Sequence, residues 1–267
     1  MVTNLFFEDG IAYRKRSSKK SAKTLIFLHG IGANSTVWSE YEEFFSKNYN
    51  VISMDLRGHG FSKRLHKKDD YAFSQFSKDL YKVLKKEKIN KCTVVGYSFS
   101  NYILLEFIKK YPHMVDSLIF ISFHSSPGKV YKSKSLRFLL KILGKIAPAG
   151  KRHLAPQDYR NYILNRESDL KTLLRSIDNM GLRQYAHMAE HTLDYEGDPI
   201  MNQIRTPTLL IHGRGDKVFP ISEAKAVVKK VETSTLIEIK KGSHRLVLEN
   251  SKEIMRKMAK YLKEVLS

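Results

Sequence analysis

Short runs of apolar and β-branched residues alternate along the chain with longer segments in which apolar residues recur every three or four positions. The runs are typical of buried strands, and the longer segments are typical of amphipathic helices. We expect strands at residues 24–28, 51–54, 93–96, 117–122, 208–212 and 235–239, and helices at 73–84, 102–111, 221–231 and 252–266. A hairpin with arms at 5–7 and 11–14 precedes them. Strand–helix alternation implies right-handed crossovers, so the pattern predicts parallel strands.

The alternation is interrupted between about residues 125 and 201. The sequence there has several helical segments and no convincing strand, and the strand–helix pattern resumes after residues 204–207. We interpret residues 125–200 as a helical cap inserted after the sixth core strand. Residues 1–124 and 201–267 would then form the core domain.

Length and composition suit one large folded domain, or a core domain carrying an insertion. The chain has 267 residues, and 42% of them are hydrophobic, which argues against disorder over most of its length. The single cysteine, Cys92, excludes an internal disulfide and a Cys-based zinc site, and its apolar surroundings in the sequence predict a buried thiol. The first residues show no secretory pattern, and no apolar run approaches the roughly 20 residues that span a bilayer. We therefore expect a soluble, cytoplasmic protein.

The formal net charge of +20 is large. Such a field attracts anions, nucleic acid or acidic lipid surfaces. The basic residues are spread along the chain and no nucleic-acid module appears, so we expect no specific nucleic-acid partner. Segment 135–146 is amphipathic, and basic residues within and beside it make this region cationic, namely Lys132, Lys134, Arg137, Lys141, Lys145, Lys151 and Arg152. This part of the cap either makes a weak contact with an anionic membrane or lipid surface, or packs on the core with its lysines in water.

Residues 94–100 carry the first chemical signal. A buried strand there runs into a sharp turn and then a helix, and a serine at such a turn stands exposed at the end of the strand. Gly96 leaves room for the turn, and the small Ser100 lets the helix approach the sheet. Ser98 is therefore a candidate nucleophile, and the simpler alternative is a helix N-cap.

A second strand ends in the glycine-rich loop His29-Gly30-Ile31-Gly32. Glycines allow backbone N–H groups to point into a cleft. A tetrahedral intermediate needs two such donors for its oxyanion, and the N–H groups of Ile31 and Phe99 are the natural pair. We expect His29 to order the loop.

Two later strand ends carry a carboxylate and an imidazole. Asp216, in the loop 212–220, is placed to accept a hydrogen bond from an imidazole. His244 follows a Gly-Ser turn, and histidine is the residue type whose ordinary pKa suits proton transfer near neutral pH. Either residue alone has an ordinary explanation as a turn or surface side chain. All four signals, however, follow predicted parallel strands, and their order is oxyanion loop, Ser, Asp, His.

On these residues the sequence resembles the α/β-hydrolase superfamily, specifically its serine esterase and lipase-like members with a helical cap. The resemblance covers nearly the whole chain outside about 125–200, with motifs at residues 29–32, 55–62, 96–100, 212–216 and 242–244. It implies a mostly parallel eight-stranded sheet flanked by helices, with a cap insertion. It also implies that Ser98 attacks the substrate, that His244 acts as base and then acid, and that Asp216 orients His244. Arg57 and His59 are expected to be structural.

The elbow departs from the family pattern at Ser100, where glycine is usual. We expect its hydroxyl to pack against a neighbouring strand or to hydrogen-bond locally. The serine at 98 excludes relatives with a carboxylate nucleophile and indicates acyl chemistry. We expect a carboxylesterase acting on small to medium acyl esters through an acyl-enzyme, without cofactor or metal. Thioesterase, acyltransferase, peptidase and C–C hydrolase activities stay open, as do a non-catalytic ligand-binding protein and the oligomeric state.

Overall fold

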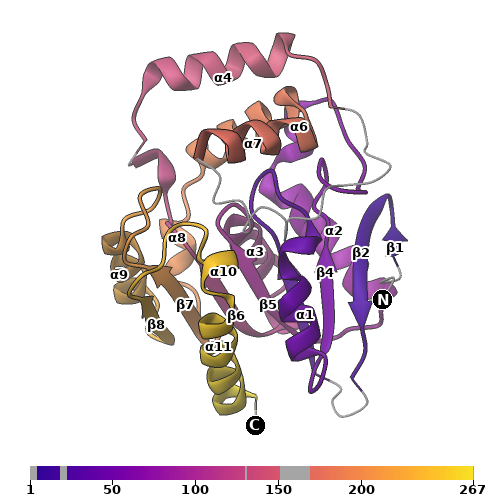
Figure 1. Ribbon diagram of the computed structural model, residues 1–267, viewed down its shortest axis with the longest axis vertical. Helices are drawn as coiled ribbons and strands as arrows, with labels where there is room; N and C mark the ends of the chain where they lie inside the picture. The colour runs from indigo at the N-terminus through magenta and orange to yellow at the C-terminus, as the bar shows by residue number, and fades with distance from the viewer. Residues whose placement is uncertain (1–4, 19–22, 130, 151–168, 267) are drawn as a thin grey trace.

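An eight-stranded sheet in the order β1-β2-β4-β3-β5-β6-β7-β8 forms the centre of the computed structural model (Figure 1). The structure describes residues 5–18, 23–129, 131–150 and 169–266. The strands are β1 (Leu5–Glu8), β2 (Ile11–Arg16), β3 (Thr24–Leu28), β4 (Asn50–Met54), β5 (Cys92–Tyr97), β6 (Val115–Ile121), β7 (Thr208–Gly213) and β8 (Ser234–Ile239). Strand β2 pairs antiparallel with β1 and β4, and the other pairs are parallel. The predicted mostly parallel eight-stranded sheet is confirmed.

Helices cover both faces of the sheet because its central strands are apolar on both sides. Along β3, Leu25 and Phe27 join one core cluster, while Ile26 and Leu28 join the other, as the alternation of side chains along a strand requires. Cys92 is buried in the second of these clusters, and burial raises the pKa of its thiol. The first face carries α1 (Ser39–Phe45) and α11 (Ser251–Val265), and the second carries α2 (Phe73–Lys86), α3 (Ser100–Lys110) and α9 (Ile221–Lys230).

Three long helices lie beyond one end of the sheet, and we call them the cap helices (Figure 1). They are α4 (Lys134–Ile146), α6 (Asp169–Met180) and α7 (Leu182–Asp194), followed by the short α8 (Asp198–Met201). Among the described residues between 125 and 200 there is no strand. Residues 151–168, with Lys151 and Arg152 of the basic set, lie outside the described part. The division of the chain into core and cap domains stays a prediction.

Helix α4 is the outermost cap helix and packs on α7. Leu140 forms a small apolar cluster with Ala186 and Leu193. Gly144 permits the close approach, because a Cβ there would lie 2.8 Å from the ring of His187. Where the chain is described, no helix is long and apolar enough to cross a membrane.

Candidate active site

Ser98 stands at the turn between β5 and α3. Its φ of 51° lies in the left-handed region that residues other than glycine rarely adopt. The carbonyl of Ile121 on β6 accepts the N–H of Ser98 at 2.9 Å and the side-chain amide of Asn101 at 2.9 Å. Gly96 is required beside this contact, since a Cβ there would lie 2.7 Å from Asn101 Oδ1. The neighbouring strand therefore holds the turn in its strained shape.

Ser100, the departure from the family elbow, forms hydrogen bonds that a glycine would lack. Its Oγ donates to the carbonyl of Leu28 on β3 at 2.8 Å and accepts the N–H of Tyr97 at 2.8 Å. The side chain is fully buried. The expected local and neighbouring-strand contacts are both present, and they join the elbow to the strand that leads into residues 29–32.

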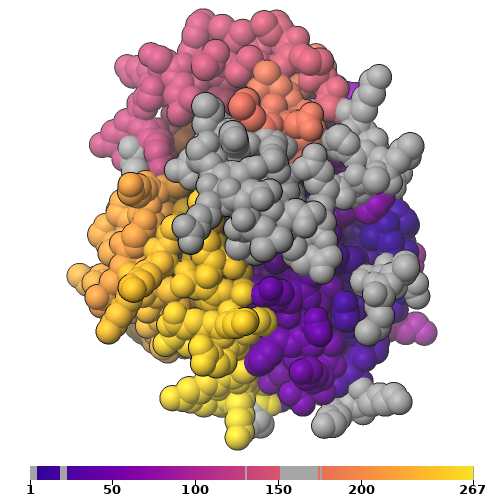
Figure 2. Space-filling view, viewed as in Figure 1, coloured from indigo at the N-terminus to yellow at the C-terminus, as the bar shows by residue number. Residues whose placement is uncertain are grey.

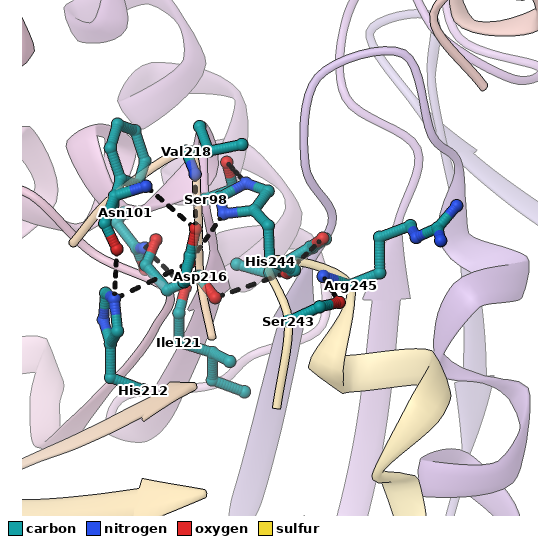
Figure 3. A network of polar contacts seen from close by, with 12 residues as sticks. Ser98, Asn101, Ile121, His212, Asp216, Val218, Ser243, His244 and Arg245 are labelled. Atoms are coloured by element: carbon teal, nitrogen blue, oxygen red, sulfur yellow. Dashed lines mark hydrogen bonds and ion pairs between the residues drawn. The ribbon is translucent and has the colours of Figure 1, made fainter. Parts of the chain in front are cut away.

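The structure brings Ser98, His244 and Asp216 together in one chain of polar contacts (Figure 3). Ser98 Oγ lies 2.9 Å from His244 Nε2, and His244 Nδ1 lies 2.8 Å from Asp216 Oδ2. Asp216 is on the loop after β7, and His244 follows β8. A carboxylate oxygen only accepts, so Nδ1 carries the imidazole proton. Nε2 is then the unprotonated nitrogen that faces the serine hydroxyl.

Asp216 is held as an anion in a buried position. Its Oδ1 accepts the N–H groups of Val218 at 2.9 Å and Phe219 at 2.8 Å. Burial by itself raises the pKa of Asp216, but the hydrogen bond and charge of His244 and the N–H of Phe219 outweigh it, so the pKa lies below its ordinary value. Asp216 is therefore a carboxylate at neutral pH.

His212 and Tyr97 support this chain, although neither was singled out from the sequence. His212 Nε2 donates to the Phe219 carbonyl at 2.8 Å and lies 3.6 Å from Asp216 Oδ2. Burial lowers the pKa of His212, which keeps it neutral. The hydroxyl of Tyr97 donates to the carbonyl of His244 at 2.9 Å. A polar residue at the end of an apolar strand was the available signal for His212.

The two expected oxyanion donors, the N–H groups of Ile31 and Phe99, belong to residues that line the same pocket as Ser98 and His244. Among the described residues neither N–H group has a hydrogen-bond acceptor. Gly32, with φ 74°, completes the turn after Ile31, and a Cβ there would lie 2.2 Å from Ser176 Cβ. The assignment of these two N–H groups as oxyanion donors stays a prediction.

His29 and His59 order the loop that carries Ile31. His59 Nε2 accepts the N–H of Gly32 at 2.9 Å, and His29 Nε2 accepts the N–H of Leu56 at 3.0 Å. Burial lowers the pKa of His29 to about 4 and that of His59 well below its ordinary value. Both rings are therefore neutral near pH 7, as acceptance of an N–H requires.

Arg57 anchors the loop that follows β4. Its guanidinium binds Asp79 through two hydrogen bonds of 2.6 and 2.7 Å and donates to the Asp70 carbonyl at 2.6 Å. Both charged side chains are buried. The paired geometry fits a structural ion pair that fastens the loop after β4 to α2.

A pocket of about 490 Å³ opens above Ser98 and His244. Cap residues make much of its wall, including Leu136 and Leu140 of α4 and Tyr185 of α7. The full set is Ile31, Ser98, Phe99, Tyr102, Pro127, Tyr131, Leu136, Leu140, Ser176, Tyr185, Ala189, Thr192, Leu193, Val218, Phe219, His244 and Arg245. Most of these side chains are apolar or aromatic. Within the described ranges, no group of three or more His, Cys, Asp or Glu side chains is placed to hold a metal ion.

Comparison with known proteins agrees with this architecture. The model of the alpha/beta hydrolase fold family matches residues 23–251. Human protein ABHD8 is 26% identical over 231 residues, which are 84% of this chain and 52% of that protein, so the chain spans about half the length of this curated relative. The chain belongs to the alpha/beta hydrolase fold family, as its sequence predicted.

Solved structures show the same fold at low sequence identity. A thermophilic esterase from Thermogutta terrifontis superimposes with a TM-score of 0.79 at 17% identity, covering 96% of this chain and 94% of the esterase. The enol-lactonase from Burkholderia xenovorans LB400 has a TM-score of 0.74 at 16% identity, covering 97% of this chain and all 100% of the lactonase. Identity this low supports the fold and leaves the reaction to be argued from the site.

Proposed function

We propose that the protein is a serine hydrolase that cleaves carboxylic esters of small to medium acyl chains through an acyl-enzyme. The observation that carries the proposal is the continuous contact from Ser98 through His244 to Asp216, with distances of 2.9 and 2.8 Å. This geometry matches the roles of nucleophile, base and orienting acid in a Ser-His-Asp hydrolase.

The proposed reaction begins when Nε2 of His244 takes the proton of the Ser98 hydroxyl while Oγ forms a bond to the ester carbonyl carbon. The carbonyl oxygen becomes an oxyanion, which the N–H groups of Ile31 and Phe99 stabilise. Collapse breaks the bond to the leaving alcohol, which receives the proton from His244. Water then attacks the acyl-enzyme in the same way, with His244 taking its proton and passing it to Ser98 Oγ. The carboxylic acid leaves, and the Ser98 hydroxyl is restored.

Asp216 acts on this sequence without touching the substrate. Its buried carboxylate fixes the His244 tautomer with Nε2 free to accept, and it stabilises the imidazolium that forms after proton transfer. The two loop N–H groups hold the carboxylate in place, and His212 fastens Phe219 of the same loop. The orientation of His244 is therefore set before substrate binds.

The pocket supports an apolar acyl group. Its volume of about 490 Å³ falls within the range of roughly 300–1,000 Å³ usual for small-molecule sites. Leu136, Leu140 and Leu193 line it together with aromatic residues. Burial of methylene groups against such a wall is worth about 0.8 kcal/mol each. We therefore expect turnover to improve with acyl length until the pocket is filled.

An ester panel tests the proposal. Purified protein is assayed on p-nitrophenyl esters from acetate to dodecanoate, with a lactone and a thioester as comparison substrates. We expect Ser98→Ala to lower kcat/KM on the order of a thousandfold. Ser77→Ala is the matched control, because Ser77 is a buried serine on α2 away from the pocket. A fluorophosphonate probe should label Ser98, as mapped by peptide mass.

Two results would contradict the proposal. The first is no turnover of any ester, and the second is equal activity of wild type and Ser98→Ala. Labelling of Ser98 without ester turnover would favour a thioesterase, acyltransferase, peptidase or C–C hydrolase with the same residues. Absence of labelling would favour a non-catalytic binding protein.

A further inference from the structure

Helix α4 exposes a row of large apolar side chains on the outside of the molecule. Phe138, Ile142 and Ile146 recur at four-residue steps and so share one helix face, and Leu139 lies beside them. Their exposed fractions are 67%, 36%, 74% and 51%. We call these four residues the α4 apolar row. Single exposed apolar residues are common on proteins, but a contiguous row marks an interaction surface.

Within the described part of the chain, the packing of α4 does not use this row. Leu140 and Gly144, on another side of α4, are buried against α7. Arg137 adds a hydrogen bond to the Leu193 carbonyl at 2.7 Å and an ion pair with Asp194. Figure 2 shows α4, in pink, as a ridge at one end of the molecule. Polar substitutions in the row should therefore leave α4 in place.

Lysines border the row. Lys141 and Lys145 directly precede Ile142 and Ile146, and Lys134 lies one turn before Phe138. All three lysines are exposed, and α4 contains no acidic residue. Among the described residues, none forms an ion pair with these lysines. The face is therefore apolar along its centre and cationic at its edge.

The row continues to the mouth of the pocket. Leu136 is 39% exposed on the same helix, and it also lines the pocket that contains Ser98. Val218 is 40% exposed and also contributes to the pocket lining. An apolar molecule that leaves a surface in contact with α4 thus meets apolar side chains on its way to Ser98.

We propose that α4 docks the protein on an anionic lipid surface, with the α4 apolar row among the acyl chains and the lysines at the headgroups. Amphipathic helices with this division of apolar and basic residues lie in the membrane interface. Lysines near such a surface are attracted to its negative charge, and the net charge of +20 acts in the same direction. Pairing with a second copy would instead bring the lysine borders of two cationic molecules together. Docking is independent of the proposed hydrolase activity, whereas delivery of an ester to Ser98 rests on it.

Vesicle co-sedimentation of the full chain tests the docking. The vesicles contain phosphatidylcholine with about 30% phosphatidylglycerol, or phosphatidylcholine alone. We expect binding to the anionic vesicles that weakens with salt. Phe138→Ser with Ile142→Ser should weaken it about tenfold or more, as should Lys141→Glu with Lys145→Glu. Hydrolysis of soluble p-nitrophenyl acetate should be unchanged in both double variants.

Matched controls use exposed residues outside the cap helices. Phe44→Ser changes an exposed aromatic residue on α1, and Lys85→Glu with Lys229→Glu reverses two exposed charges on α2 and α9. Both controls should bind vesicles like wild type, and so should Ser98→Ala. If binding persists while no variant hydrolyses esters, the proposed function fails and the docking stands.

Three outcomes would overturn the docking. If the wild-type protein does not bind anionic vesicles, docking on an anionic lipid surface is excluded. Equal losses in the α4 variants and in the controls exclude a specific role for α4. A dimer in solution that Phe138→Ser with Ile142→Ser converts to a monomer assigns the row to a second copy of the chain.

Discussion

His59 Nε2 accepts the backbone N–H of Gly32 at 2.9 Å, which ties the loop after β4 to the loop after β3. The neighbouring Ile31 carries one of the two proposed oxyanion donors. His59, a buried histidine distant from Ser98 in the chain, thus holds part of the site, because its neutral Nε2 accepts the Gly32 N–H.

Replacing His59 with alanine should weaken both fold and activity. The buried N–H of Gly32 would lose its acceptor, which costs about 1–3 kcal/mol in the free energy of unfolding. The freed loop should also lower kcat for esters more than it changes KM. His113→Ala is the control, since His113 is exposed. Chemical denaturation and ester kinetics measure the two effects, and a His59→Ala protein as stable as the control would contradict the assignment.

Mild acid should destabilise the protein through His29 and His59. Burial holds the pKa of His29 at about 4 and that of His59 well below the ordinary value of 6.5. Below pH 6.5 the unfolded chain binds protons that the folded protein does not. The stabilisation is therefore complete above pH 6.5 and is lost as pH falls toward 4, by about 1.4 kcal/mol per pH unit for each histidine. Denaturation curves between about pH 7 and pH 5 measure this slope, and a flat profile would refute it.

Ser98 should store backbone strain that glycine relieves. At φ 51° a side chain crowds the backbone, and glycine does not. Both Ser98→Gly and Ser98→Ala remove the hydroxyl, so their difference isolates the strain. We expect the glycine variant to unfold with a free energy about 1 kcal/mol higher than the alanine variant, while both lose ester hydrolysis. Equal stability of the two variants would mean that the turn relaxes.

Ser100→Gly restores the usual family residue, yet it should destabilise this protein. The change removes the acceptor of the buried Tyr97 N–H and the donor to the Leu28 carbonyl. A loss of about 1–3 kcal/mol follows from an unsatisfied buried N–H group. Thermal unfolding measures it, and Ser98 should keep most of its reactivity toward a fluorophosphonate. If the Ser100→Gly protein were more stable than wild type, the hydrogen bonds of the Ser100 hydroxyl would stabilise the fold less than glycine stabilises the turn.

Asp216→Asn should lower kcat by about a thousandfold or more with little change in fold. The amide is nearly isosteric, but it no longer stabilises an imidazolium and can donate to Nδ1, which favours the wrong His244 tautomer. Single-turnover kinetics on the preferred ester measure the loss. Activity within tenfold of wild type would argue against Asp216 as the orienting acid.

The strands and the elbow were predictable because their signals are local. Predicted strand and helix ends lie within two residues of the observed ones, as at β3 and β7. Apolar runs indicate burial on both faces of the sheet, and Gly96 indicates a steric limit within the turn between β5 and α3. His212 was missed because its partner carbonyl belongs to Phe219, and a single polar residue in an apolar strand does not reveal that contact.

In the cap, the sequence indicated helices and a basic amphipathic segment, but it did not indicate what these helices pack against. In this region Tyr185 lines the pocket, while Met180 and Met188 are packed in the core. Helical spacing shows that a face is apolar, and it does not show which neighbour covers that face. The packing of α7 against one side of α4 is what leaves the α4 apolar row exposed.

Patterns a few residues long predicted the sheet, the elbow and the order of Ser98, Asp216 and His244. Tertiary packing sets the contact between these three side chains, the hydrogen bond from Ser100 to β3 and the exposure of apolar residues on α4. These features could not be read locally because hydrogen bonds and burial form between segments distant in the chain, as with Ser98 and His244, which are 146 positions apart. Their geometry is set by how the helices and loops pack around the sheet.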